Sequence, residues 1–161
     1  MTQTKIKKSP ITENFHHAGL IVQDVDRVAE YYESLGIGPF EPLTLNVTER
    51  KFRGKPIVGV QLKIRMAHVG STRIELIQPV VGEGPWRDFL NHHGEGCAHL
   101  AFVVDDIDKA VGEMLRRGMN IVYQSKFADG GAAAYLESDK IGGIMLELFQ
   151  RPNDYVAHKK K

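Results

Sequence analysis

Residues His17–Asp26 read HAGLIVQDVD, and residues His99–Asp108, which lie 82 positions further along the chain, read HLAFVVDDID. Each segment begins with a histidine, continues through a short run of small or aliphatic residues and ends in an acidic turn. A sequence that recurs at a constant offset is the signature of a duplicated structural unit. We therefore expect two copies of one supersecondary motif, each beginning with a buried strand.

Each copy is predicted to continue into one amphipathic helix. Asp24 and Asp106 stand where a helix N-cap is needed, because a short polar side chain there accepts from free backbone N–H groups. Apolar residues then follow at spacings of three and four, which describe one face of a helix. Gly36 and Gly118, again 82 residues apart, are placed to end the two helices in the left-handed conformation.

After each helix the pattern changes to that of strands. We expect strands near residues 40–48, 57–67 and 71–78 in the first half, and near 120–126, 132–138 and 143–149 in the second. Each half then has the order βαβββ, and its sheet would expose an apolar face unless the other half covered it. The predicted fold class is α+β, with two tandem βαβββ modules that form an open, cup-shaped mixed β-sheet.

The length of 161 residues is that of one domain. The expected division is a single domain at residues 15–150 with two tails: module one (15–80), a linker with a short helix (81–96), module two (97–150), and tails at 1–14 and 151–161.

The last predicted strand of each half carries a glutamate in matching surroundings, IELIQP around Glu75 and LELFQRP around Glu147. A carboxylate in a buried strand is costly unless it is protonated, paired or bound to a metal. The spacing from histidine to glutamate is 58 residues in the first half and 48 in the second. We expect the ten extra residues to form a surface loop near 49–56, because loop insertions cost little.

A pseudo-twofold relation between the halves would bring the equivalent residues to one point inside the cup. The predicted ligands of one divalent metal are His17, Glu75, His99 and Glu147. Such a nitrogen and oxygen donor set suits Zn, Co, Mn, Ni or Fe(II). The remaining histidines are expected to lie outside the site, and His16 should face the opposite side of a regular strand from His17.

The charges and apolar runs exclude several partners. The 21 basic and 20 acidic residues leave a net charge of +1, which gives no reason to expect nucleic acid or a membrane surface. No run approaches the roughly 20 apolar residues of a membrane span, and the N-terminus does not resemble a signal peptide. The single cysteine, Cys97, fits a reducing compartment. A cytoplasmic location is therefore expected.

Four segments, in this order, resemble the vicinal-oxygen-chelate superfamily of glyoxalase I, methylmalonyl-CoA epimerase, bleomycin-binding proteins and extradiol dioxygenases: HAGLIVQDVDRVAEYYESLGI, STRIELIQP, GEGCAHLAFVVDDIDKAV and IGGIMLELFQ. The resemblance covers nearly all of residues 15–150 and is greatest to methylmalonyl-CoA epimerase and glyoxalase I-like proteins. It implies that the same four residues hold the metal, which polarises a carbonyl. It also implies that a carboxylate, Glu147 or Glu75, moves a proton.

The resemblance implies a metal-dependent isomerase, epimerase or lyase that abstracts a proton α to a carbonyl. Its substrate would be a small molecule, an acyl-CoA or another thioester, and the protein would be a homodimer. Three alternatives stay open: a glyoxalase I-like lactoylglutathione lyase, a ring-cleaving dioxygenase, and a non-catalytic binding protein of the bleomycin-resistance type. Fold alone does not decide among them.

The sequence departs from the epimerases at one place. Those enzymes carry a second catalytic glutamate upstream of the position that Glu75 matches, and the corresponding residues 55–61 contain no carboxylate. Glu49 and Gln61 are the nearest polar candidates. A metal-ligating glutamate that acts as the base, as in glyoxalase I, would need no such residue.

Two further features stay open from the sequence. Lys63 and Arg65 alternate along a predicted strand, where they face either an anionic part of the substrate or solvent. Trp86, in the linker, is either a core residue or the anchor of an interface.

Overall fold

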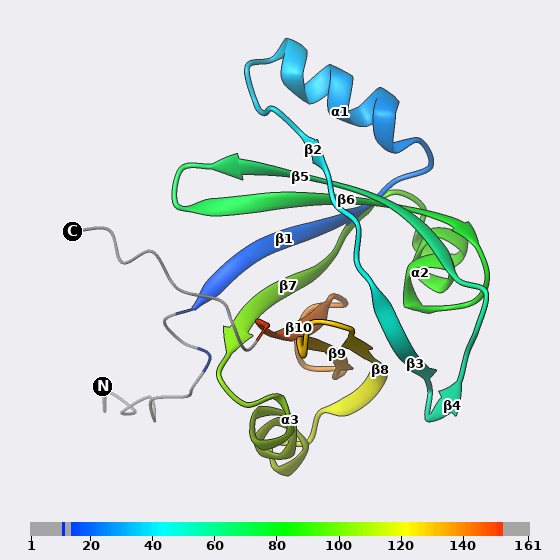
Figure 1. Cartoon of the computed structure of the whole chain (residues 1–161), viewed down its shortest axis with the longest axis vertical. Helices are drawn as coiled ribbons and strands as arrows, with labels where there is room; N and C mark the ends of the chain where they lie inside the picture. Colours follow the sequence, from blue (N-terminus) through cyan, green and yellow to red (C-terminus); the bar gives the residue numbers. More distant parts are fainter. Residues whose placement is uncertain (1–10, 12–13, 153–161) are drawn as a thin grey trace.

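The computed structural model describes residue 11 and residues 14–152 (Figure 1). Most of the two expected tails, 1–14 and 151–161, and with them His158, lie outside the described residues. The elements follow in the order β1 (Phe15–Ile21), α1 (Val25–Ser34), β2 (Glu41–Pro42), β3 (Val47–Phe52), β4 (Lys55–Pro56), β5 (Gln61–Val69), β6 (Thr72–Val81), α2 (Pro85–His93), β7 (Gly96–Val104), α3 (Ile107–Arg116), β8 (Asn120–Phe127), β9 (Ala132–Glu137) and β10 (Met145–Gln150).

The strands form one curved, mixed sheet in the order β2-β5-β6-β1-β7-β10-β9-β8-β3-β4. β1 and β7 pair antiparallel at its centre. Each of them also pairs parallel with the last strand of its own half, β1 with β6 and β7 with β10. The two halves are therefore built alike around the central pair, and the predicted α+β fold with an open mixed sheet is confirmed.

The predicted helix signals are confirmed. The Asp24 carboxylate accepts from the backbone N–H groups of Asp26 and Arg27 at the start of α1, and the Asp106 carboxylate accepts from that of Lys109 in α3. Both helices lie on the outer face of the sheet (Figure 1). Val25 and Ala29 of α1 belong to a buried apolar cluster with Leu76 of β6, and α3 contacts β8, β9 and β10 in the same way.

The ten extra residues of the first half do not form a surface loop near 49–56, and the strand expected near 40–48 is present only as β2 and the first residues of β3. The edge strand β2 has only two residues, which pair with Met66 and Arg65 of β5. The chain then crosses to the second half, where β3 pairs antiparallel with β8 and forms a short hairpin with β4. This crossing adds a wall to the cup (Figure 1).

The short helix expected in the linker is α2. Its Trp86 is 4% exposed and belongs to the apolar cluster inside the cup, so it is a core residue rather than the anchor of an interface. The exact division of residues 15–150 into modules and a linker stays a prediction. In residues 14–152 we find no helix with the length and apolar character needed to cross a membrane.

Candidate metal centre

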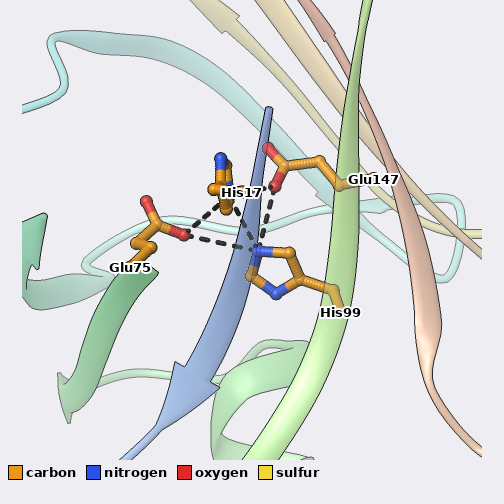
Figure 2. Close-up of side chains that lie close together, drawn as sticks. All are labelled: His17, Glu75, His99 and Glu147. Carbon is orange, nitrogen blue, oxygen red and sulfur yellow. Dashed lines mark hydrogen bonds and ion pairs between the residues drawn. The ribbon is translucent and has the colours of Figure 1, made fainter. Parts of the chain in front are cut away.

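The four predicted ligands lie on the four central strands of the sheet: His17 on β1, Glu75 on β6, His99 on β7 and Glu147 on β10 (Figure 2). The strand register explains why they meet. Glu75 lies beside Gly19, two residues after His17, and Glu147 lies beside Ala101, two residues after His99. Because residues two apart share a face of a strand, each histidine and its glutamate project into the cup together.

The donor atoms of these four side chains converge on one point. His17 Nε2 lies 3.1 Å from Glu75 Oε2 and 3.1 Å from Glu147 Oε2. His99 Nε2 lies 3.3 Å and 3.0 Å from the same two oxygens, and 3.1 Å from His17 Nε2. Two atoms bound to one Zn²⁺ at about 2.0–2.2 Å would lie roughly 3 Å apart. The spacing therefore fits a shared ion.

The burial of the site calls for positive charge beside its two carboxylates. His99 is fully buried, and the other three residues are at most 6% exposed. Glu75 Oε2 and Glu147 Oε2 are buried and close to the imidazole nitrogens, yet neither makes a hydrogen bond of ordinary geometry. Such carboxylate oxygens are stable only beside positive charge. The residues fit a divalent metal by position and by donor type, and that they bind one stays a prediction.

The two histidines and the two glutamates shift one another's pKa values. Burial lowers the pKa of His17, but the nearby Glu75 and Glu147 carboxylates outweigh it and raise that pKa to about 10. The same carboxylates outweigh burial at His99 and raise its pKa. Burial raises the pKa of each glutamate, while the two histidines lower it more, so both carboxyl groups titrate below their usual range. In the metal-free site, His17 is therefore an imidazolium beside two ionised carboxylates.

We expect metal binding to release protons and to strengthen as pH rises. An imidazole must lose its Nε2 proton to bind an ion, and His17 keeps that proton in the metal-free protein below a pKa of about 10. Between roughly pH 6 and 8, each released proton should raise the affinity about tenfold per pH unit. Calorimetry with Mn²⁺ in buffers of different ionisation enthalpy counts the protons. Binding without proton release would contradict these charge states.

His16 does not face away from the site, as a regular strand would require. A β-bulge between Phe15 and His17 turns it, and His16 Nδ1 lies 2.8 Å from His17 Nδ1. Burial and the neighbouring His17 lower the pKa of His16 to about 4, so its ring is neutral near pH 7. It can therefore accept from His17 Nδ1–H, which leaves His17 Nε2 directed at the cluster.

Replacing His16 with phenylalanine should weaken metal binding by about 10-fold, because loss of a hydrogen bond to a ligand histidine typically costs 10–100-fold in affinity. The phenyl ring keeps the contact of His16 with Phe149, whose ring centroid is 5.7 Å away. Competition with a chromophoric chelator measures the affinity. His92→Phe is the matched control, since His92 is exposed on α2. Equal affinities for both variants would show that His16 does not orient His17.

The other sequence candidates lie elsewhere. His68, His92 and His93 are exposed. Lys63 and Arg65 form ion pairs with Asp26 of α1, on the outer face of the sheet, and do not face a substrate inside the cup.

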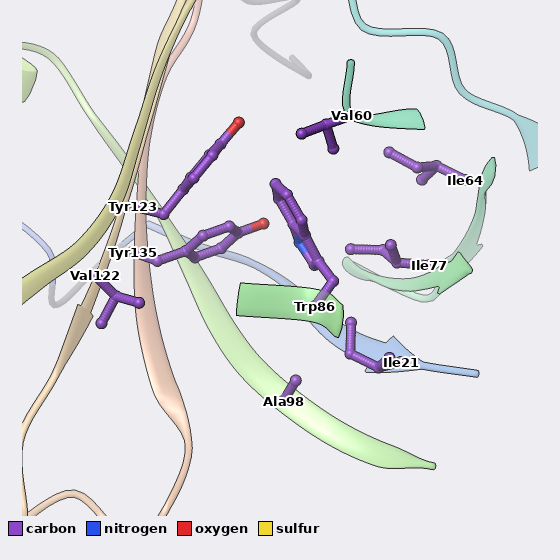
Figure 3. Close-up of a cluster of buried hydrophobic side chains, with 9 residues drawn as sticks. All are labelled: Ile21, Val60, Ile64, Ile77, Trp86, Ala98, Val122, Tyr123 and Tyr135. Atoms are coloured by element: carbon purple, nitrogen blue, oxygen red, sulfur yellow. The ribbon is translucent and has the colours of Figure 1, made fainter. Parts of the chain in front are cut away.

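A cavity of about 260 Å³ opens beside the cluster and reaches both glutamates. Its aromatic wall is formed by Trp86, Tyr123 and Tyr135, and the rings of the two tyrosines project toward Trp86 (Figure 3). Tyr135 also contacts His99, with ring centroids 5.0 Å apart. The aromatic rings therefore connect the apolar interior of the cup with the candidate metal centre.

Polar lining residues complete the cavity, and the sequence did not single out two of them, Arg50 and Ser125. Among the described residues that line it, Glu75 and Glu147 are the only carboxylates. Glu49, the nearest upstream candidate for a second base, is exposed and pairs with Lys126 at 3.1 Å on the other face of β3. Gln61 does line the cavity.

Comparisons with known proteins agree with this fold. The family model described as the glyoxalase/bleomycin resistance protein/dioxygenase superfamily matches residues 16–135. Mitochondrial methylmalonyl-CoA epimerase of Bos taurus is 26% identical over 139 residues, which cover 84% of this chain and 73% of the bovine protein.

Two solved structures are similar in fold. Methylmalonyl-CoA epimerase from Mycobacterium tuberculosis has a TM-score of 0.62 at 21% identity, with 91% of this chain and 93% of the other covered. A Streptomyces coelicolor methylmalonyl-CoA epimerase in complex with 2-nitronate-propionyl-CoA has a TM-score of 0.61 at 20% identity, with 85% and 96% covered.

Proposed function

The chain belongs to the glyoxalase/bleomycin resistance protein/dioxygenase superfamily, and we propose that within it the protein is a metal-dependent enzyme that abstracts a proton α to the carbonyl of an acyl-CoA, as a methylmalonyl-CoA epimerase does. The observation that carries this proposal is the buried convergence of two histidines and two glutamates at the wall of a cavity. The bovine relative and the Streptomyces coelicolor structure support an acyl-CoA as the substrate class.

His17, Glu75, His99 and Glu147 would hold the metal. A divalent ion in this place supplies Lewis-acid polarisation of a carbonyl and stabilises negative charge on its oxygen. Only one oxygen of each carboxylate, Oε2, takes part in the convergence. The Oε1 atom of Glu147 or Glu75 is then available as the base.

A glyoxalase I-like isomerisation of a hemithioacetal is the second candidate. The carboxylates of the cavity favour this reaction, because it needs no base apart from a metal ligand. Glu75 and Glu147 are the only carboxylates among the described residues that line the cavity, and both belong to the candidate metal site. A ligand glutamate would then have to act as the base in either reaction. The homodimer and the cytoplasmic location stay predictions.

Hydrogen exchange at the α-carbon tests the proposal. Protein loaded with Co²⁺ or Mn²⁺ should exchange the α-proton of methylmalonyl-CoA in D₂O, as followed by NMR, and metal-stripped protein should lose this activity. Exchange with a methylglyoxal–glutathione hemithioacetal instead would select the second candidate. Metal-loaded protein that binds these compounds and exchanges neither would support a non-catalytic binding protein, and full activity without metal would refute both reactions.

A further inference from the structure

Arg50 is a charged residue in the wall of the cavity. It lies on β3, directly opposite Ser125 of β8, and in an antiparallel pair directly opposite residues share a face of the sheet. Ser125 is 5% exposed, and both residues line the cavity together with Tyr123. The crossing of β3 to the second half therefore brings a guanidinium group into the cup.

The guanidinium of Arg50 lacks a full set of partners. Its Nε atom is buried and makes no hydrogen bond within the described chain. Arg50 also forms no ion pair there, whereas its neighbours Lys126, Glu49 and Arg53 all do. A buried donor of this kind calls for an acceptor, and a carboxylate matches the planar fork of a guanidinium best.

The charge balance of the cavity points in the same direction. The two carboxylates of Glu75 and Glu147 would cancel the charge of a divalent ion between them. Of the described residues that line the cavity, Arg50 is the only one with a cationic side chain. The metal-loaded cavity would thus carry one net positive charge, which favours a ligand with a negative charge of its own.

We propose that Arg50 is a specificity-determining residue of the cavity, which binds the free carboxylate on the acyl group of the thioester substrate. The inference rests on the proposed function, because it places that substrate in the cavity beside the metal centre. The burial of Arg50 Nε and the small volume of about 260 Å³ favour a carboxylate over a phosphate of coenzyme A. Tyr123 lines the same wall, and its hydroxyl oxygen can accept a hydrogen bond from the Arg50 guanidinium.

Binding of small acids tests this assignment without turnover. Methylmalonate, with two carboxylates, and propionate, with one, are titrated into Mn²⁺-loaded protein and followed by paramagnetic line broadening in NMR. Wild type should bind methylmalonate at least 10-fold more tightly than propionate. Arg50→Met should remove this preference and leave propionate binding unchanged, while Arg50→Lys should retain part of it.

Lys51→Met is the matched control, because Lys51 is the next residue of β3, is exposed and does not line the cavity. It should bind both acids as wild type does. The assignment is overturned if Arg50→Met keeps the preference, if wild type has none, or if Arg50→Met weakens the binding of free coenzyme A rather than of methylmalonate. The last result would mean that Arg50 holds a phosphate.

Failure of the substrate inference and failure of the proposed function give different results. A preference for methylmalonate that depends on Arg50, without α-proton exchange of methylmalonyl-CoA by wild type, would keep the carboxylate subsite and reject the epimerase reaction. Exchange with the same KM in wild type and Arg50→Met would keep the reaction and reject the subsite.

Discussion

Replacing Glu147 with glutamine should reduce metal-dependent proton exchange by about 10³-fold or more, since general base catalysis alone contributes roughly 10²–10⁴-fold. The amide keeps the shape of the side chain but removes a negative charge that faces both His17 and His99, at 3.1 Å and 3.0 Å. It should therefore also weaken metal binding. Exchange rates by NMR and metal content of the purified protein are measured together on one preparation.

The control and the comparison variant separate the two roles of this carboxylate. Glu137→Gln removes an exposed carboxylate at the end of β9 and should change neither quantity. Glu75→Gln changes the equivalent ligand of the first half. If Glu147→Gln keeps its metal and loses exchange while Glu75→Gln retains exchange, Glu147 is the base. Glu147→Gln protein with wild-type exchange would contradict the proposed mechanism.

The positions of the four candidate ligands could be predicted because the duplication carries the information twice. In each half, the first strand carries a histidine, and the last strand carries a glutamate. The glutamate lies opposite the residue two positions after that histidine, as Glu75 lies opposite Gly19. One such pair would have been ambiguous, since a glutamate in a strand often faces solvent. Two pairs in equivalent strand positions define an axis, and the central antiparallel pairing of β1 and β7 brings them together.

The residues that the sequence did not predict depend on departures from this symmetry. Thr48–Lys51 are polar on both faces and show no alternation, so β3 could not be recognised as a strand, and its cavity-facing Arg50 was missed with it. His16 was placed on the wrong face because a single bulge in β1 is not visible in the order of residue types. Local irregularity, rather than fold class, limited the prediction of the site.

A second departure from symmetry explains why β1 carries a glycine. Gly19 and Ala101 are equivalent in the repeat, and each faces a histidine across the central pair, Gly19 facing His99 and Ala101 facing His17. At Ala101 a methyl group is accommodated. At Gly19 a Cβ atom would lie 1.9 Å from His99 Cε1 and 2.1 Å from Nε2. The His99 ring therefore occupies the space that any side chain at this position would need.

Gly19→Ala should accordingly displace His99 and weaken metal binding by about 100-fold, as loss of an oriented ligand does. It should also cost roughly 1–3 kcal/mol of unfolding free energy, because overpacking a core forces side chains from their favoured rotamers. His99 has little room to retreat, since it is fully buried and contacts Tyr135 on β9. Urea unfolding of metal-free protein and chelator competition measure the two effects separately.

Gly112→Ala is the matched control with the opposite expected sign. Gly112 lies inside α3, where the nearest atom to an added Cβ is 3.6 Å away, so alanine should stabilise the protein by about 0.5–1 kcal/mol and leave metal affinity unchanged. Wild-type metal affinity in Gly19→Ala would mean that His99 reaches the ion from another rotamer. The close packing of Gly19 against the imidazole would then not be what holds the fourth donor in place, and the burial of His99 would need a different reason.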